Sequence, residues 1–228
     1  MYSFSSKIKL TALISMIVGL VAVIYSFIAT PSSVADLHQG GEAAHDPAHL
    51  EHMLHMLQNK PWAALYVAAL FFLLISLGVL AFYAINRAAQ AGWAPILFRV
   101  MEGITGYLPV GALIFFVLLV CSGLHLNHLF IWMDPQVVAH DTVIQGKTGY
   151  LNVPMFLVRA AVYLLGWIAY RQITRKLSLQ QDEATDNRPF IKAFKWSAGF
   201  LVFFLVTESM MSWDWVMSVD PHWFSTLF

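Results

Sequence analysis

Five long apolar stretches dominate the pattern of hydrophobic and polar residues along the chain. They cover roughly residues 10–29, 62–85, 95–122, 153–170 and 190–217. A helix needs about 20 largely apolar residues to cross the hydrocarbon core of a bilayer. The pattern therefore predicts an all-α fold, a polytopic bundle of five transmembrane helices that forms a single transmembrane domain over residues 1–228.

The basic residues between these stretches predict the orientation of the bundle. Lys7 and Lys9 precede the first stretch, whereas the loops over residues 30–60 and 123–152 hold only Lys60 and Lys147. The other connections carry Arg87, Arg171, Arg175, Lys176 and Arg188. Because cytoplasmic loops hold the excess of Lys and Arg, we expect the N-terminus and the loop over residues 171–189 to be cytoplasmic. The loops over residues 30–60 and 123–152 would then be periplasmic in a bacterial cell.

Composition agrees with a membrane protein. The chain is 59% hydrophobic and 11% charged, whereas a soluble domain carries roughly 25% charged residues. The formal net charge is zero, so nothing in the composition indicates a nucleic-acid surface. Cys121 is the single cysteine, which excludes internal disulfides and thiolate metal clusters. There is no C-x-x-C-H motif for covalent haem attachment.

The first outer loop is rich in histidine. A helical pattern after Pro47 would place His45, His49, His52 and His55 near one face, and histidine clusters bind zinc or copper. The alternative is a plain amphipathic helix at the membrane surface with solvated imidazoles. We prefer that alternative, because no carboxylate or cysteine is arranged as a further ligand.

Ionisable residues inside the apolar stretches are the candidate functional residues. Such side chains are costly in hydrocarbon and survive where they face protein or water. At about 1.5 Å per helical residue, one group falls in the outer half of the bilayer and a second near the inner side. The outer group consists of His125, His128, Arg159, Tyr163, Glu208, Ser212 and Asp214. The inner group is Arg99 and Glu102, three residues apart on one helix face.

Three uses suit these residues. Carboxylates, imidazoles and hydroxyls can relay protons through a dry bundle. Histidine with Asp or Glu can also take the protons of a quinol and donate to its carbonyl oxygens. The plain alternative is a set of interhelical salt bridges that hold the bundle together. A haem held by this chain alone is not expected, because His125 and His128 are on one helix and no other span holds a histidine.

Several runs of the sequence resemble one family. They are NKPWAALYVAALFFLLISLGVLAFYAINRAAQAGW, LFRVMEGITGYL, SGLHLNHLFIWMDPQVVAHD, IQGKTGYLNVPMFLVRA and TESMMSWDWVMSVDPHWFSTLF. Together they resemble the NrfD-like integral membrane subunits of bacterial alternative complex III, and in particular the second of the two, also called quinone-binding subunit 2. That complex is a quinol:cytochrome c or quinol:oxidase oxidoreductase of the bacterial inner membrane. The resemblance covers essentially the whole chain.

The resemblance implies a larger fold and a set of partners. Members of the family have about ten transmembrane helices arranged as two four-helix bundles with peripheral helices, so this chain would correspond to the N-terminal half. The implied partners are the other, sister NrfD-like subunit, a multihaem cytochrome, an iron–sulfur subunit and a monohaem cytochrome, with a terminal oxidase as a further candidate. Haem and iron–sulfur clusters would lie in those partners, menaquinol would be oxidised at the sister NrfD-like subunit, and this chain would hold no redox centre of its own. Menaquinone and phospholipids are its implied non-covalent ligands, and no cofactor would be bound covalently.

Three functional hypotheses follow. The first is a respiratory membrane subunit with a quinone-site-like cavity and a proton pathway. In that pathway the outer group and the inner pair, Arg99 and Glu102, would form two half-channels. The second is a structural anchor that docks periplasmic haem and iron–sulfur subunits. The third, which we rank below the others, is an ion-coupled transporter, because Gly103, Gly106 and Pro109 interrupt the third stretch as in many transporter helices.

Overall fold

The computed structural model describes residues 5–34 and 47–223, apart from the side chains of residues 47–49, 51 and 52. The described residues form helices and connecting loops, with no strand among them. Five helical stretches are long and apolar enough to cross a membrane, which confirms the predicted all-α polytopic architecture. Contacts between residues divide the chain into two compact units, residues 1–65 and 66–228.

The first unit contains α1 (Ser6–Ile28) and the beginning of α2 (Pro47–Ala88). The side chain of Ser5 caps α1 by accepting a hydrogen bond from the backbone N–H of Ile8 at 3.4 Å. Residues 10–28 of α1 are apolar on nearly every side, so the sequence of α1 specifies no single packing face. In agreement with this pattern, no residue of α1 is buried within the described chain.

The beginning of α2 corrects one expectation. The sequence predicted a loop over residues 30–60 with a short surface helix, followed by a span that begins at Trp62. The structure instead has one helix of 42 residues that continues through Pro61. A proline removes one backbone donor, but helices in membranes tolerate this where the freed backbone groups find other partners. The ring of Trp62 meets that of Phe27 edge-on, with centroids 5.2 Å apart, which links the two helices of the first unit.

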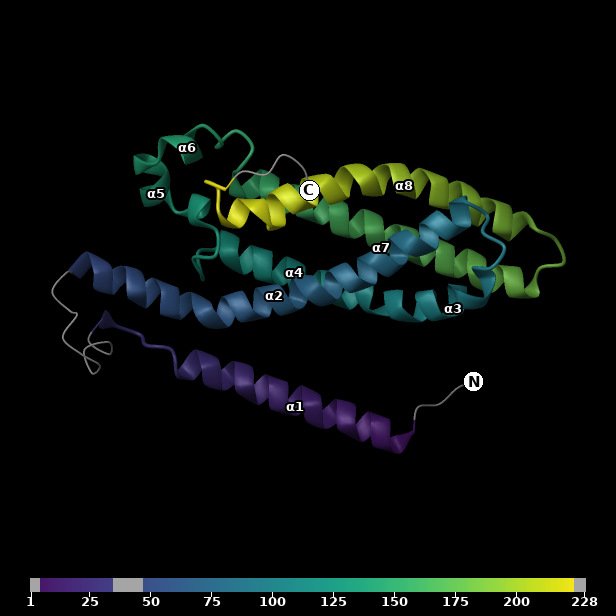
Figure 1. Cartoon of the computed structure of the whole chain (residues 1–228), viewed down its shortest axis with the longest axis horizontal. Coiled ribbons are helices and arrows are strands. Elements are labelled where there is room, and N and C mark those ends of the chain that lie inside the picture. Colours follow the sequence, from purple (N-terminus) through teal and green to yellow (C-terminus); the bar gives the residue numbers. More distant parts are fainter. Residues whose placement is uncertain (1–4, 35–46, 224–228) are drawn as a thin grey trace. The chain divides into compact units, whose positions relative to one another are not determined.

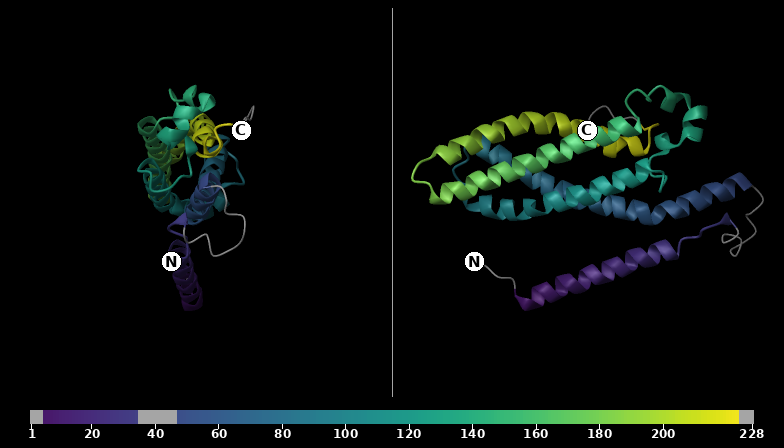
Figure 2. Two further views of the ribbon diagram at one scale, coloured as in Figure 1. Left: turned by 90° about the vertical axis from the view of Figure 1, so that its left-hand side faces the viewer. Right: turned by 180° about the vertical axis from the view of Figure 1, so that it is seen from behind.

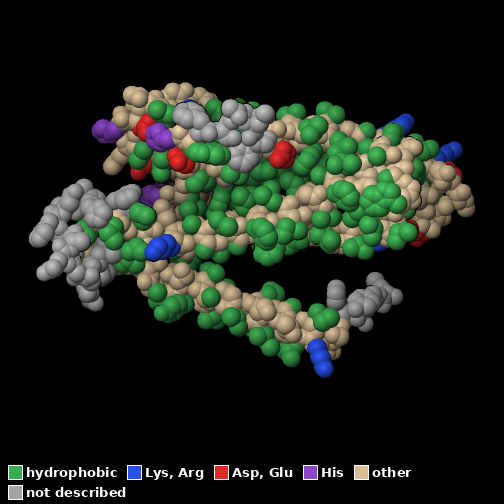
Figure 3. Space-filling model, in the orientation of Figure 1, with side chains coloured by type: hydrophobic (Ala, Val, Ile, Leu, Met, Phe, Trp, Pro, Cys, Tyr) green, Lys and Arg blue, Asp and Glu red, His purple; other side chains and the backbone are tan. Residues whose placement is uncertain are grey.

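The second unit is a helical bundle. It contains residues 66–88 of α2, α3 (Pro95–Ile104), η2 (Thr105–Tyr107), α4 (Leu108–Gly123), α7 (Val153–Glu183) and α8 (Arg188–Trp215). Helices α7 and α8 lie side by side along most of their length, and α4 packs on α7 (Figures 1 and 2). On the face shown in Figure 3, hydrophobic side chains cover much of the middle of this unit, and most charged ones lie towards its ends. This distribution fits a unit whose middle faces hydrocarbon.

The third predicted span is interrupted. A 3₁₀ turn over Thr105–Tyr107 separates α3 from α4, between Gly103 and Pro109. Glycine weakens a helix and proline cannot donate its backbone N–H, so an interruption at this position follows from the sequence. The break confirms that this span is discontinuous, as its glycine and proline content indicated.

The fourth predicted span is longer than expected. We predicted its end at Tyr170 and a loop over residues 171–189, whereas α7 continues to Glu183 and leaves only a short connection to α8. Residues 171–183 contain no glycine or proline and consist largely of good helix formers. The polar end of the span therefore stays helical instead of becoming a loop.

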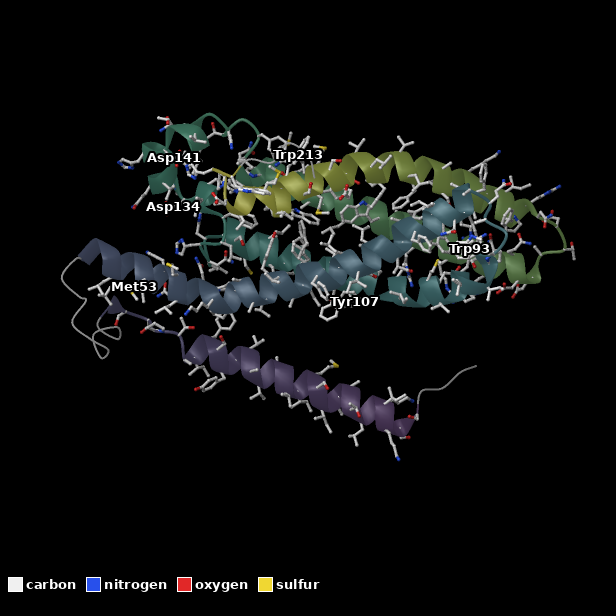
Figure 4. The ribbon with its side chains drawn as sticks, in the orientation of Figure 1. Met53, Trp93, Tyr107, Asp134, Asp141 and Trp213 are labelled. Carbon is white, nitrogen blue, oxygen red and sulfur yellow. The ribbon has the colours of Figure 1, made fainter. Side chains whose placement is uncertain are left out.

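The second outer loop, residues 123–152, is ordered by side-chain caps. It contains η3 (Ile131–Met133), α5 (Pro135–His140) and α6 (Thr142–Gln145). Asp134 begins α5 by accepting from Gln136 N at 2.8 Å, and Pro135 occupies the first turn. Asp134, Asp141 and Trp213 lie towards one end of the second unit and Trp93 lies at the other (Figure 4). The second outer loop and the end of α8 are therefore on the same side of the bundle.

Candidate functional site

A buried ion pair joins α7 to α8. Arg159 Nε donates to Asp214 Oδ2 at 2.8 Å, and Arg159 Nη2 donates to Asp214 Oδ1 at 2.7 Å. Asp214 is 0% exposed and Arg159 is 8% exposed. Two parallel contacts match the planar guanidinium to the carboxylate, so the pair fixes the register of α7 against α8.

Two tyrosines complete what we call the outer network, named for its predicted side of the membrane: Tyr150, Arg159, Tyr163 and Asp214. The Tyr163 hydroxyl donates to Asp214 Oδ2 at 3.1 Å. Arg159 Nη1 donates to the backbone oxygen of Tyr150 at 3.1 Å, and the guanidinium carbon lies 3.9 Å from the centre of the Tyr150 ring. Burial, and after it the negative charge of Asp214, raise the pKa of Tyr150 to about 12. Its hydroxyl therefore stays protonated at neutral pH.

An aromatic layer packs next to the outer network. Trp215 is fully buried, with its ring centroid 4.7 Å from that of Phe115 and 5.9 Å from that of Trp167. The Tyr66 hydroxyl donates to the backbone oxygen of Trp215 at 2.7 Å, and Trp167 Nε1 donates to the Thr207 hydroxyl at 3.0 Å. These contacts hold α2, α4, α7 and α8 together and exclude water from one side of the network, which strengthens its electrostatic interactions.

Glu208 and Ser212 lie outside the outer network. Glu208 is half-buried and makes no hydrogen bond or ion pair with any residue that the structure describes. Glu208 precedes Asp214 by six residues, a spacing that places the two on different sides of α8. Their burial agrees with this placement, because only Asp214 is fully buried. Ser212 is buried, but its hydroxyl donates to the backbone oxygen of Ser209 at 2.8 Å, as is common for serine in helices.

His125 and His128 line a separate cavity of about 280 Å³ in the second outer loop, and neither Arg159 nor Asp214 is among its lining residues. His125 adopts a positive φ of 58°, which is uncommon outside glycine. The buried side chain of Asn127 also lines the cavity, and its Nδ2 has no acceptor among the described residues. The cavity is thus lined by two histidines and by an asparagine whose amide donor is unused.

A second cavity borders the outer network directly. It has a volume of about 420 Å³, and Tyr150 of the network forms part of its wall together with Trp213 and Trp223. Lys147 also lines it and donates to the backbone oxygen of Pro221 at 2.5 Å, which closes the loop over residues 146–151 onto the end of the described chain. Its mainly apolar and aromatic wall suits a flat organic group.

A contact between a histidine and a carboxylate joins the second outer loop to the residues after α8. His222 Nε2 lies 2.6 Å from Asp141 Oδ2. Asp141 also caps α6 by accepting from Val143 N at 2.9 Å and Ile144 N at 3.1 Å. The pKa of Asp141 is lowered, mainly by the hydrogen bond from the backbone N–H of Ile144 and further by His222. This cap therefore stabilises the fold at pH values above the ordinary pKa of Asp. The stabilisation is lost as the pH falls through the lowered pKa of Asp141.

The inner network surrounds Glu102 at the opposite end of the second unit. Its members are Tyr83, Arg87, Arg99, Glu102, Arg175 and Asp182. Arg99 Nη1 lies 3.0 Å from Glu102 Oε2, which agrees with the predicted pairing three residues apart, and Arg175 Nη1 contacts the same oxygen. Arg99 also pairs with Asp182 of α7.

Aromatic groups shield the inner side of this network. The Tyr83 hydroxyl donates to Glu102 Oε1 at 3.3 Å and accepts from Arg87 Nε at 3.2 Å. The Arg87 guanidinium carbon lies 4.2 Å from the centre of the Phe98 ring. Glu102 is 7% exposed, so the network holds a buried carboxylate between α2, α3 and α7.

Sequence reasoning found some of these residues and missed others. It identified Arg159, Tyr163 and Asp214, which the structure brings together, although it could not distinguish them from Glu208 and the two histidines, which lie elsewhere. It missed Tyr150, whose signal was weak: a loop tyrosine just ahead of the helix cap Asn152. It also missed the inner partners Tyr83, Arg87, Arg175 and Asp182, which looked like a core aromatic residue and solvated loop charges.

The histidine-rich segment is only partly described. His45 lies outside the described residues, and the side chains of His49 and His52 are likewise not described. His55 is exposed on α2. Within residues 5–34 and 47–223, no group of three or more His, Cys, Asp or Glu side chains could hold a metal ion. The metal site on His45, His49, His52 and His55, which we ranked below a plain surface helix, therefore stays an untested alternative.

Comparison of the chain with models of protein families and with curated proteins found no match.

Proposed function

We propose that the chain is a membrane subunit of a respiratory quinol:cytochrome c or quinol:oxidase oxidoreductase, and that its buried charges form a proton pathway. The observation that carries the proposal is the outer network. It gathers a carboxylate, a guanidinium and a tyrosine hydroxyl from two helices around a point that is closed to lipid. Ionisable groups inside membrane spans are rare, and they mark ion and proton pathways in many membrane proteins.

Glu208 is the residue that favours a proton pathway over a set of structural salt bridges. Asp214 and Glu102 are each compensated by guanidinium groups, whereas Glu208 has no charged partner among the described residues. A carboxyl group without a fixed cation can take up and release a proton, because its charge is not already compensated. It lies about 9 Å along α8 from Asp214, on the side towards the inner network. Glu208 would thus pass protons between the two half-channels.

The cavities support a quinone-site-like role. The cavity of about 280 Å³ is lined by His125, His128 and Asn127, and the amide of Asn127 has a donor without an acceptor among the described residues. A quinone carbonyl is an acceptor for such a donor. Menaquinone is the ligand that the family resemblance implies. The implied haem and iron–sulfur partners would carry the electrons, so no redox step is assigned to this chain.

One observation favours the alternative of a structural anchor. The bidentate geometry between Arg159 and Asp214 is also what a tie between two helices requires. The two functions differ in what Glu208 does, because a tie needs a partner and Glu208 has none among the described residues.

Replacement of Glu208 by Gln tests the proposed function. In the intact complex, reconstituted in sealed vesicles, Glu208→Gln should lower the number of protons translocated per electron by at least about twofold, while the subunits still assemble. Gln keeps the shape and hydrogen bonding of the side chain but cannot release a proton. The matched control is Glu183→Gln at the exposed end of α7, which should leave the number of protons translocated per electron unchanged. An unchanged proton ratio, or loss of assembly with normal turnover of the remaining complex, would favour the anchor.

A further inference from the structure

One face of α7 carries an apolar groove that is followed directly by a basic groove. The apolar groove has a volume of about 360 Å³ and lies between α4 and α7, where Ala161, Leu164, Leu165 and Ile168 form its α7 wall. The basic groove has a volume of about 420 Å³ and is lined by residues of α7 between Arg171 and Glu183.

The spacing of these residues makes the two grooves one continuous stripe. Residues 161, 164, 165 and 168 are followed by 171, 172, 175, 176 and 179, in steps of three and four. Side chains with this spacing lie above one another on a single helix face. The apolar part extends for about 10 Å and ends one turn before the first basic residue. The stripe thus changes from apolar to cationic along a single line.

Arg171 marks the point where the stripe changes. Its guanidinium makes no ion pair with any residue that the structure describes, and its Nε is buried without an acceptor. The group lies close to η2, since a Cβ added at Gly106 would be 3.6 Å from Arg171 Nη2. A buried guanidinium nitrogen without an acceptor is costly, so an anion at this position would be stabilising.

The nearby carboxylates are already in use. Glu102 is bound by Arg99 and Arg175, and Asp182 is bound by Arg99. Arg171 and the exposed Lys176 therefore add positive charge that no described carboxylate neutralises, and only Glu183, at the far end of the groove, opposes it. The charge of the groove fits an anionic ligand.

We propose that this stripe binds an anionic glycerophospholipid of the adjacent leaflet. Its phosphate would contact Arg171 and Lys176, and one acyl chain would lie in the groove between α4 and α7. Arg171 directly follows the predicted end of the apolar span, which is the level of the headgroups. Basic sites at the ends of membrane helices attract anionic lipids. A free phosphate ion shares the headgroup chemistry but would leave the apolar groove unused.

Lipid binding to the purified full-length chain in detergent tests the proposal. Native mass spectrometry would compare phosphatidylglycerol with phosphatidylcholine of the same chain length, with inorganic phosphate as a competitor. The wild-type chain should retain phosphatidylglycerol preferentially, and Arg171→Gln should weaken its binding about fivefold or more. The control is Arg188→Gln, which removes the same charge at a side chain that is 85% exposed and outside the stripe.

A second variant tests the acyl groove without disturbing the core. Leu165 is 64% exposed, so Leu165→Ser should leave the fold intact while it weakens binding of long-chain phosphatidylglycerol. Binding that is equal for both lipids, or that Arg171→Gln leaves unchanged, would overturn the proposal. Displacement of the lipid by millimolar inorganic phosphate would also overturn it, because the site would then be one for the free ion.

Discussion

Replacing Asp214 by Asn is expected to lower the stability of the second unit by about 3–5 kcal/mol. The substitution removes the negative charge but leaves Arg159 buried between α7 and α8 with no other carboxylate among the contacts that the structure describes. An uncompensated guanidinium at a buried position is strongly unfavourable. Unfolding of the full-length chain in mixed micelles, followed by circular dichroism against denaturant, measures the effect.

Two controls identify the cause of this loss. Asp220→Asn changes an exposed carboxylate beyond α8 and should shift stability by less than about 0.5 kcal/mol. The double variant Arg159→Met with Asp214→Leu removes both charges and should recover most of the stability, because a buried ion pair contributes little beyond an apolar pair of similar volume. If the single Asp214→Asn variant is as stable as the wild type, the buried charge of Arg159 is not compensated by Asp214 and the account of this ion pair is wrong.

Replacing Glu102 by Gln is expected to have the second largest effect, a loss of about 1–3 kcal/mol. Glu102 accepts contacts from Arg99, Arg175 and Tyr83. The loss should be smaller than at Asp214, because the side chains of Arg99 and Arg175 are 40% and 38% exposed and water can solvate the freed charge. The same unfolding experiment compares the two variants directly.

The control for Glu102→Gln is the surface pair between Asp186 and Arg188. Asp186→Asn breaks an ion pair whose side chains are 51% and 85% exposed, and it should change stability by no more than about 1 kcal/mol. If Glu102→Gln were as mild as Asp186→Asn, the inner network would be a solvated surface cluster and not a buried group between three helices.

The architecture could be predicted from the sequence because membrane spans are set by length and hydrophobicity alone. Each of the five stretches became a helix or a pair of helices. The boundaries failed where polar residues continued a helix. Residues 171–183 are charged but favour helix, and Pro61 did not end α2. Hydropathy indicates whether a residue favours lipid or water and not its backbone conformation, so it cannot locate the end of a helix that continues with polar residues.

The candidate site could be predicted only in part. The cost of charge in hydrocarbon identified Arg159, Asp214 and Glu102 as buried and partnered, and the structure places each of them in a network. Which residues meet depends on how helices pack, and apolar periodicity in a membrane span gives little information about neighbours. For this reason the grouping of Glu208 with Asp214, and of His125 and His128 with Arg159, did not follow from the sequence.

A density map of the intact complex, at a resolution that shows ordered water, tests the proposed proton pathway most directly. We expect a water-filled connection from Tyr163 and Asp214 past Glu208 towards Glu102, with Glu208 facing that connection or a neighbouring subunit. A map in which Glu208 points into acyl chains, with dry packing between the outer and inner networks, would contradict the proton pathway and leave these charges as ties between helices.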